Sequence, residues 1–262
     1  MYKNSIEFAI TGDYALFSDP ITRVGGEKFT YQVPTYEAIK GVVHSIYWKP
    51  TIIWVIDKVR VMNRIQTETR GVRPIKYNGK YDKEGKGSTN NDLSYYTYLK
   101  KCHYQVKAHF IWNENRPELA YDRNENKHYN IAKRMVEKGG RRDIFLGTRE
   151  CQAYVTPCVY GEGKGEYDNI AELNFGMMLH GITYPDEAYS EETRNMLTVR
   201  LWNPIMRYGE IKFCRQRNFS QSMTSVLGEV YGNCIQRPVR EMEMKHFELE
   251  QENFSGLDEF KV

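Results

Sequence analysis

The sequence predicts an α+β protein, because segments with the two-residue period of strands are interrupted by two segments with the spacing of amphipathic helices. Hydrophobic residues make up 40% and charged residues 27% of the chain, a balance typical of folded globular domains. Its 262 residues form one large domain or two modest ones. We therefore expect a sizeable core and neither a disordered nor a fibrous chain.

The first three elements are predicted as strand, helix and strand. Apolar residues alternate along residues 6–10, which is typical of a half-buried strand. A helix is predicted after Pro34, where apolar residues recur with near-helical spacing until Pro50 ends it. The following segment, 51–62, is rich in β-branched residues and predicts the second strand.

Three further elements complete the order β-α-β-β-α-β. A third strand is predicted at 98–112, with one apolar and one polar face, and a second helix at 128–138, which Gly139 ends. The last strand lies near 151–160. This order is that of the ferredoxin-like or RNA-recognition-motif fold.

The chain is predicted to divide into two domains. Residues 1–164 form the ferredoxin-like domain, with a polar, glycine-rich inserted loop or β-hairpin at about 66–94. Such an insertion is either a flexible surface loop or a binding element. Residues 165–262 are predicted to form a smaller, antiparallel β-rich domain. Its last segment is an acidic tail, and we expect this tail to be solvated surface.

Several common functional classes are excluded by the sequence. Neither a bilayer-spanning apolar run nor a signal-peptide pattern occurs, so a cytoplasmic protein is expected. The five cysteines contain no C-x-x-C pair, and the six histidines are not spaced with acids as metal ligands. Nucleotide-binding, zinc-protease and serine-hydrolase motifs are also absent. We expect acid–base chemistry without metal or other cofactor.

The stretch from Asp122 to Glu150 concentrates positive charge. Between residues 127 and 149 it holds seven Lys or Arg and two acids, although the whole chain carries only +3. Lys127 and His128 stand at the predicted start of the second helix. Unpaired backbone N–H groups there can bind a phosphate. The positive end of the helix dipole disfavours the charged form of His128 and so favours a neutral imidazole. The alternative is that His128 is an ordinary surface or capping residue.

Other residues are candidates for RNA contact. Arginine forks match phosphate oxygens, and the twenty tyrosines could stack on unpaired bases or fill the core. The Gly-Gly-Arg-Arg loop at 139–142 is either a phosphate clamp or a charged turn, and the polar face of the third strand is either liganded or solvated. The predicted RNA-binding residues are Lys107, His109, Lys133, Arg134, Arg141, Arg142 and Arg149.

Over nearly its whole length the sequence resembles CRISPR-associated protein five of the type I-C (Dvulg) subtype. The matching stretches are collinear, and several are long. They are GDYALFSDP (12–20), GGEKFTYQVPTYEAIKG (25–41), SIYWKP (45–50), GVRPI (71–75), YTYLKKCHYQVKAHF (96–110), RNENKHY (123–129), GGRRDIFLGTRECQAYV (139–155) and RLWNP (200–204).

The resemblance implies an endoribonuclease that cuts CRISPR repeat RNA without metal and stays bound to the 5′ handle of the product within a type I-C interference complex. It places a catalytic tyrosine at Tyr47 and a Lys-His pair at Lys127 and His128. Asn126 stands where some relatives have glycine, which alters backbone freedom beside the pair. The partners implied are the repeat RNA and the backbone and large subunits of that complex.

The implied chemistry uses the 2′-OH of RNA as the nucleophile and leaves a 2′,3′-cyclic phosphate and a 5′-OH. His128 would act as general base or acid, Lys127 would stabilise the phosphorane, and Tyr47 would orient the 2′-OH or protonate the leaving oxygen. One alternative is a non-catalytic subunit that binds the 5′ handle. A DNA nuclease is a third possibility, less favoured because DNA lacks the 2′-OH.

Overall fold

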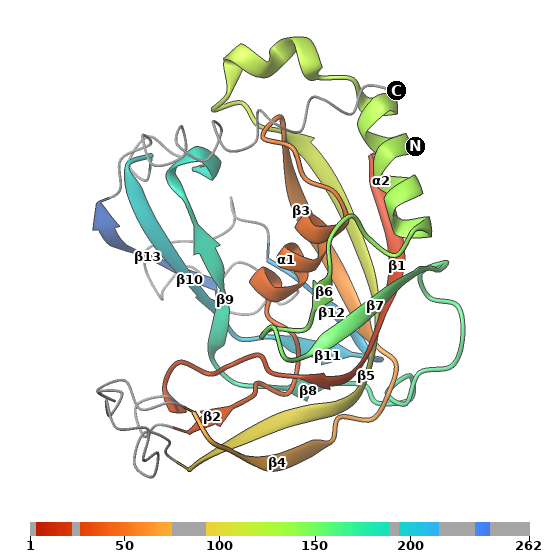
Figure 1. Cartoon of the computed structure of the whole chain (residues 1–262), viewed down its shortest axis with the longest axis vertical. Helices are drawn as coiled ribbons and strands as arrows, with labels where there is room; N and C mark the ends of the chain where they lie inside the picture. Colours follow the sequence, from red (N-terminus) through yellow and green to blue (C-terminus); the bar gives the residue numbers. More distant parts are fainter. Residues whose placement is uncertain (1–3, 23–26, 75–92, 189–193, 215–233, 242–262) are drawn as a thin grey trace, which may run out of the picture.

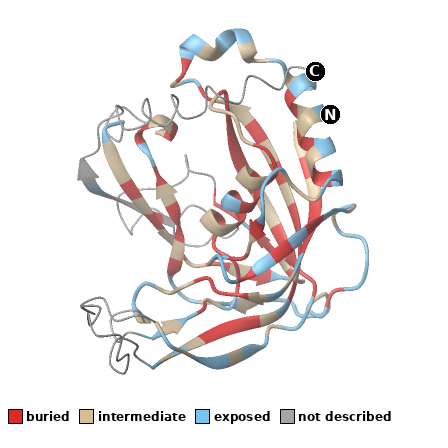
Figure 2. Cartoon of the chain, in the orientation of Figure 1, coloured by how far each residue is buried: buried red, intermediate tan, exposed pale blue. Residues whose placement is uncertain are grey.

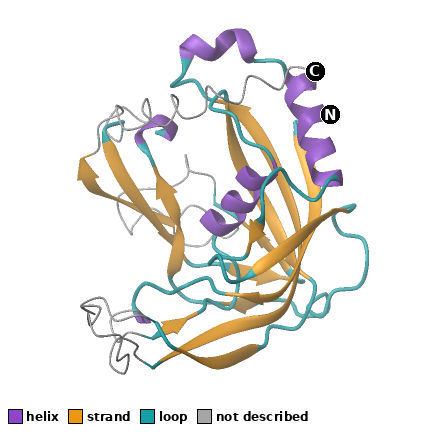
Figure 3. Cartoon of the chain, viewed as in Figure 1, coloured by secondary structure: helices purple, strands orange, loops and turns teal. Residues whose placement is uncertain are grey.

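The computed structural model describes residues 4–22, 27–74, 93–188, 194–214 and 234–241. A large, mostly antiparallel sheet runs through the molecule, and helices α1 (Tyr36–Ile46) and α2 (Glu125–Glu137) pack on the same face of it (Figure 1). This is an α+β fold dominated by strands (Figure 3). None of the described helices is long and apolar enough to cross a membrane.

The large sheet is built around the 19-residue strand β5. Strand β1 pairs along one edge of β5 and strand β3 along the other, both antiparallel. The order across the sheet is β6 (Ile144–Phe145), β7 (Gln152–Pro157), β1 (Ser5–Ala15), β5 (Ser94–Trp112), β3 (Ile52–Val61), β12 (Glu210–Lys212), β11 (Ile205–Arg207) and β8 (Leu173–Asn174).

The first part of β5 extends beyond its main partners and carries a small arm. Strand β4 (Thr67–Val72) pairs antiparallel with residues 94–99 of β5, and strand β2 (Lys28–Phe29) pairs parallel with residues 96–97. The insertion expected at about 66–94 therefore begins with a strand. Its residues 75–92 lie outside the described residues.

A second sheet lies beside α1, in the order β13 (Cys234–Glu241), β10 (Met196–Trp202), β9 (Met178–Thr183) (Figure 1). Lys40 of α1 forms a buried ion pair with Glu187 of the short helix η3 (Pro185–Glu187), and Glu37 accepts a hydrogen bond from the Ile182 amide at 3.1 Å. The expected division of the chain near residue 165 stays a prediction, since strands that follow it occur in both sheets. The acidic tail beyond Glu241 lies outside the described residues.

Both helices begin with specific N-caps, and α2 also ends with a specific cap. The side chains of Thr35 and Asn124 accept hydrogen bonds from backbone amides of the first turns of α1 and α2, as N-caps do. At the end of α2, Gly139 has φ of +82°, and the amides of Gly139 and Gly140 bond to carbonyls of Val136 and Met135. This left-handed turn, for which glycine is suited, confirms the predicted helix stop.

The core lies between the helices and the sheet, and its buried residues appear red in Figure 2. The strands predicted at 6–10, 51–62, 98–112 and 151–160 and both helices are confirmed, with somewhat different bounds. Strand β4 fits the β-hairpin alternative for the insertion, whereas the two-residue strands β2 and β6 and the short helix η2 (Pro117–Asp122) were not expected. They are too short or too polar for hydrophobic periodicity to indicate them.

We expect Gly147→Ala to destabilise the protein strongly. Gly147 has φ of +91°, and a Cβ at this position would lie 2.0 Å from the Leu16 carbonyl oxygen, so the loop between β6 and β7 would be pushed away from the segment that follows β1. The matched control is Gly161→Ala, because Gly161 has φ of +94° but open space around it. Urea unfolding should show a loss of about 1 kcal/mol for the control and at least about 2 kcal/mol for Gly147→Ala. Equal losses would contradict the contact.

Candidate active site

Two side chains predicted to be catalytic meet inside the protein. Tyr47 follows the last residue of α1, and His128 lies in the first turn of α2. The Tyr47 hydroxyl and Nδ1 of His128 are 2.8 Å apart, although 81 residues separate them in the chain. The convergence that the sequence could not establish is therefore present.

The backbone around Tyr47 is held on two sides. Its carbonyl oxygen accepts a hydrogen bond of 2.7 Å from the indole N–H of Trp54 in β3. Two residues earlier, the Ser45 carbonyl accepts from the backbone amides of both Arg141 (3.1 Å) and Arg142 (3.0 Å). The loop that follows α2 is thus tied to the last turn of α1.

Asp122 holds the other side of His128. Nε2 of the imidazole lies 2.9 Å from the Asp122 carbonyl oxygen and 3.4 Å from its Oδ2. The carboxylate also accepts a hydrogen bond of 2.7 Å from Thr51 and pairs with the ammonium group of Lys127. Sequence reasoning missed Asp122 and Thr51. The only signal was an acid five residues before Lys127.

These contacts assign a tautomer to His128. A backbone carbonyl can only accept a hydrogen bond, so Nε2 must carry the proton. In the neutral imidazole Nδ1 is then an acceptor, and the Tyr47 hydroxyl donates to it. Nδ1 is therefore the basic nitrogen, and it faces the tyrosine.

Burial sets the protonation states of this cluster. Desolvation lowers the pKa of His128, opposed by Asp122 and reinforced by Lys127 and Lys49. The sequence led us to expect a neutral imidazole because of the helix dipole. The main cause in the structure is burial. Desolvation also raises the pKa of Tyr47, which stays a neutral donor. At Asp122 desolvation raises the pKa, but hydrogen bonds from Lys127 and Thr51 outweigh it and the net pKa is lowered.

The three predicted catalytic residues differ in exposure. His128 is 0% and Tyr47 is 2% exposed, packed among rings that include Phe110 and Trp112. The Lys127 side chain, by contrast, is 49% exposed. A phosphate in solvent can reach Lys127 directly, whereas it reaches the tyrosine–histidine pair only if a side chain moves.

Most of the predicted RNA-binding residues lie on the helix side of the sheet. Lys133 and Arg134 project from α2, and Arg141 and Arg142 lie in the loop after it, all exposed. The Arg149 guanidinium lies over the Phe145 ring, 5.6 Å from its centroid.

Lys107 and His109 lie elsewhere. Their side chains alternate with those of Phe110 and Val106 in β5, so they point to the sheet face opposite the helices. Lys107 pairs with Glu7 at 2.7 Å, and His109 pairs with Asp57 at 2.9 Å. The structure does not bring these two residues together with the basic residues of α2.

The candidate site holds no evident metal cluster. Among the described residues, no group of three or more His, Cys, Asp or Glu side chains could hold a metal ion. The polar atoms around His128 belong instead to a hydrogen-bonded chain, which runs from Tyr47 through His128 to Asp122 and Thr51.

Comparison with known proteins identifies a family. The model of the Cas5d family of CRISPR-associated proteins matches residues 5–214. A relative named CRISPR pre-crRNA endoribonuclease Cas5d, from Mannheimia succiniciproducens, is 29% identical over 201 residues, which cover 69% of this chain and 86% of the relative. A protein of the same name from Thermus thermophilus is 26% identical over 184 residues, covering 70% and 75%. A solved structure of a CRISPR-associated protein matches with a TM-score of 0.64 and 32% identity, covering 82% of this chain and 93% of that one.

Because His128 is buried in its neutral form, it should contribute to the pH dependence of stability. Its folded pKa lies below the ordinary value of 6.5, so the unfolded chain binds more protons as the pH falls through 6.5. Stability should therefore decrease from pH 7.5 to pH 5. We expect a smaller decrease in His128→Gln, whose amide can still donate to the Asp122 carbonyl. Urea unfolding at both pH values measures the change in the free energy of unfolding. The contributions of the other histidines are the same in both proteins and cancel in the comparison. An identical decrease in both proteins would contradict the assignment.

Proposed function

The chain belongs to the Cas5d family of CRISPR-associated proteins, and from this premise we propose that it is an endoribonuclease that cuts CRISPR repeat transcripts and stays bound to the product. The names of the two curated relatives support this activity. The observation that carries the proposal is the 2.8 Å contact between Tyr47 and His128, with Lys127 beside it.

We assign β1, α1, β3, β5, α2 and β7 to a ferredoxin-like unit of the RNA-recognition-motif type. The neighbouring order β7-β1-β5-β3, with both helices on one face, supports this assignment. The same face carries the basic residues of α2 and the loop after it. RNA would therefore lie on the helix side.

The proposed reaction is a metal-independent transesterification. Nδ1 of His128 takes the proton of the 2′-OH, and O2′ attacks the adjacent phosphorus as the bond from phosphorus to O5′ breaks. The Tyr47 hydroxyl donates its proton to O5′, giving a 2′,3′-cyclic phosphate and a 5′-OH. The proton on His128 then returns to Tyr47 along the hydrogen bond that joins them. This cycle consumes no proton.

The enzyme must open before it reacts. Since the pair is buried, the Tyr47 side chain has to turn away from Nδ1 so that the 2′-OH can take its place. Breaking one hydrogen bond costs about 1 kcal/mol, which is small beside the interactions an RNA makes with several cations. Lys127, already exposed, would bind the scissile phosphate and stabilise its charge in the transition state.

Asp122 is proposed as a positioning residue. Its carbonyl fixes the proton of His128 on Nε2, which keeps Nδ1 free to act as a base, and its carboxylate holds Lys127 beside the site. Such orientation of a histidine by a hydrogen-bonded partner is common in acid–base catalysis. Thr51 in turn fixes the carboxylate.

A second candidate function is a non-catalytic subunit that binds the 5′ handle of the guide RNA. The complete burial of His128 favours it, because a histidine with 0% exposure is also what a purely structural role would produce. In either case we propose that the chain assembles with the backbone and large subunits of a type I-C interference complex.

Cleavage in the absence of metal separates the two functions. Purified protein incubated in EDTA with its cognate repeat RNA should cut once, and a 2′-deoxy nucleotide at the cut site should abolish the cut. Absence of any cut with the all-RNA substrate would eliminate the enzyme and leave the subunit that binds the 5′ handle. Cleavage of the deoxy substrate would eliminate the 2′-OH mechanism.

His128→Ala should slow single-turnover cleavage about 100-fold or more, because a general base contributes at least this much. Tyr47→Phe should slow it about tenfold or more while RNA affinity stays the same. Tyr154→Phe is the matched control, since Tyr154 is exposed on β7. If either active-site variant cuts at the wild-type rate, that residue has no catalytic role.

Asp122→Asn should slow cleavage about tenfold while leaving the backbone carbonyl in place, because it removes only the charge that holds Lys127 and the imidazole. Thr51→Val should show a smaller effect of the same kind. The pH–rate profile distinguishes positioning from simple loss of stability. Asp122→Asn should shift the acidic limb of the pH–rate profile, because the Asp122 carboxylate acts on the pKa of His128. An unchanged profile together with a wild-type rate would show that Asp122 has no role in the site.

A further inference from the structure

The short helix η3 lies in the connection between strands β9 and β10 of the second sheet and is attached to two other parts of the chain. Its Glu187 forms the buried ion pair with Lys40 of α1. The side-chain amide of Asn115, in the loop that follows β5, donates hydrogen bonds to the carbonyl oxygens of Asp186 at 3.0 Å and Ala188 at 3.1 Å. Helix η3 therefore bridges α1 and the loop after β5.

Both attachments lead toward the candidate active site. The ion pair is made to α1, and Tyr47 follows the last residue of that helix. On the other route, the backbone amide of Asn115 donates to the side-chain oxygen of Asn113 at 3.1 Å. Asn113 is 3% exposed and takes no part in the proposed reaction.

Asn113 joins the two segments that carry the reacting side chains. Its backbone amide donates to the Thr51 carbonyl at 2.9 Å and its side-chain amide to the Pro50 carbonyl at 3.2 Å, both in the segment between Tyr47 and β3. Its own carbonyl accepts a hydrogen bond of 2.9 Å from the guanidinium group of Arg123, in the segment that leads into α2. The segment after α1 and the segment before α2 are thus held at a fixed separation.

This link matters most when the site opens. In the proposed reaction the Tyr47 side chain turns away from Nδ1 of His128, so the 2.8 Å contact between them no longer fixes their separation. The attachments through Asn113 and η3 do not depend on that contact, because other side chains and the backbone make them. They keep the two segments in place while the 2′-OH enters.

The ion pair between Lys40 and Glu187 is better explained by orientation than by stability. Their side chains are 4% and 11% exposed. Well-packed apolar side chains in place of a buried pair often hold two elements together at least as well, whereas an ion pair also fixes direction and distance through its hydrogen bond. Burial raises the pKa of Glu187, but Lys40, with His44 and Arg200, outweighs burial, so the net pKa is lowered and the carboxylate stays charged.

We propose that η3 makes the second sheet part of the cleavage machinery, because it fixes the separation of the segments that carry Tyr47 and His128. Its positioning residues are Asn115, Lys40 and Glu187. A displacement of the reacting groups by about 1 Å can slow a reaction about 100-fold, so even a partial loss of this bridge should be measurable. The proposal rests on the proposed function, since positioning matters only if the site reacts.

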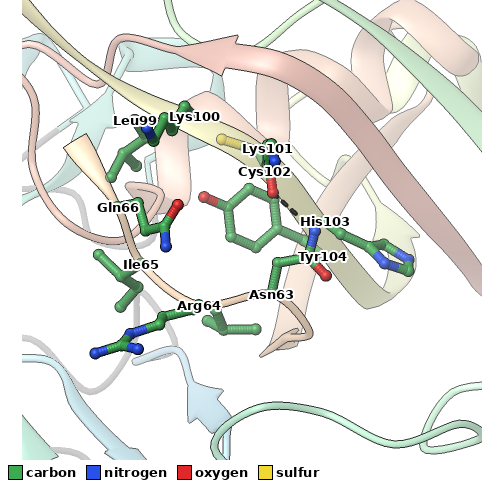
Figure 4. Close-up of a pocket in the computed structure, with 11 residues that line it drawn as sticks. Asn63, Arg64, Ile65, Gln66, Leu99, Lys100, Lys101, Cys102, His103 and Tyr104 are labelled. Carbon is green, nitrogen blue, oxygen red and sulfur yellow. Dashed lines mark hydrogen bonds between the residues drawn. The ribbon is translucent and has the colours of Figure 1, made fainter. Parts of the chain in front are cut away.

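A matched control lies at the opposite end of β3. A small pocket there, between the end of β3 and the turn in β5 at Lys101, is filled at its centre by the Tyr104 ring and has room for about one water molecule (Figure 4). The side-chain amide of Asn63, which lines this pocket, donates to the Lys101 carbonyl at 2.8 Å. Strand β3 spans about 30 Å from there to the segment after Tyr47. Asn63 therefore makes the same kind of contact as Asn115, far from the candidate site.

The test measures single-turnover cleavage of repeat RNA in EDTA, with the enzyme in saturating excess. Asn115→Ala should cut with a rate constant about tenfold lower than that of the wild type, and Lys40→Met/Glu187→Met should show a loss of similar size. Affinity for uncleavable 2′-deoxy repeat RNA should not change, because these side chains bind other parts of the protein. Asn63→Ala should behave as the wild type.

The rate constant separates positioning from a loss of stability. Unfolded molecules do not cut, so partial unfolding lowers the amount of active enzyme but not the rate constant at saturating enzyme. Urea unfolding should show Lys40→Met/Glu187→Met to be at least as stable as the wild type. Asn115 is half-buried, so Asn115→Ala should fold, and it decides the question by itself if the paired variant does not fold.

Two results would overturn the proposal and keep the cleavage reaction. One is a wild-type rate constant in the folded η3 variants, and the other is an equal loss in Asn63→Ala. A wild type that cuts nothing in EDTA would instead remove the proposed function, and the positioning role with it.

Discussion

The candidate site depends on the attachment of α2 to α1 at two points. Near its start, His128 bonds to Tyr47, and after its end the amides of Arg141 and Arg142 bond to the Ser45 carbonyl. The second attachment requires the left-handed turn at Gly139, which brings the chain back toward α1. Without the second attachment α2 would be held by its packing on the sheet and by the buried contacts of His128, and a shift of the imidazole by about 1 Å would break its hydrogen bond to the tyrosine.

In the proposed mechanism, burial and catalysis are compatible because they concern different states of the site. Without RNA, the Tyr47 hydroxyl satisfies Nδ1 and the ring packing excludes water, which keeps the histidine neutral. Lys127 stays outside, where it is available for the first phosphate contact. An RNA that binds to the cations but does not insert its 2′-OH would leave the pair closed. In the proposed mechanism, this arrangement would couple reaction to correct docking, as induced fit does.

The sequence predicted the elements better than the site. Alternation and β-branched residues indicated the long strands, since those signals are local, but β2 and β6 are pairings of two residues and leave no periodic pattern. The contact between Tyr47 and His128 required knowledge of how α1 and α2 pack, which no local pattern contains. The hydrogen bond from His128 to Asp122 goes to the backbone carbonyl, which any residue possesses, so the residue type gave no signal for it. Alternation had already placed Lys107 on the polar face of β5, but no local pattern showed that this face lies opposite the helices and their basic residues.

Acidic partners for the basic side chains are distributed unevenly between the two faces of the large sheet. On the sheet face away from the helices, Lys58, Arg60 and Lys107 are each paired with a carboxylate. On the helix side, Lys133 and Arg134 form no ion pair within the described residues. The small net charge of +3 of the whole chain therefore conceals a local excess of positive charge between residues 127 and 149. A polyanion approaching such a molecule is drawn to the helix side before any base is read, because the field acts at longer range than hydrogen bonds. RNA would then meet Lys127 from the side on which its ammonium group is exposed.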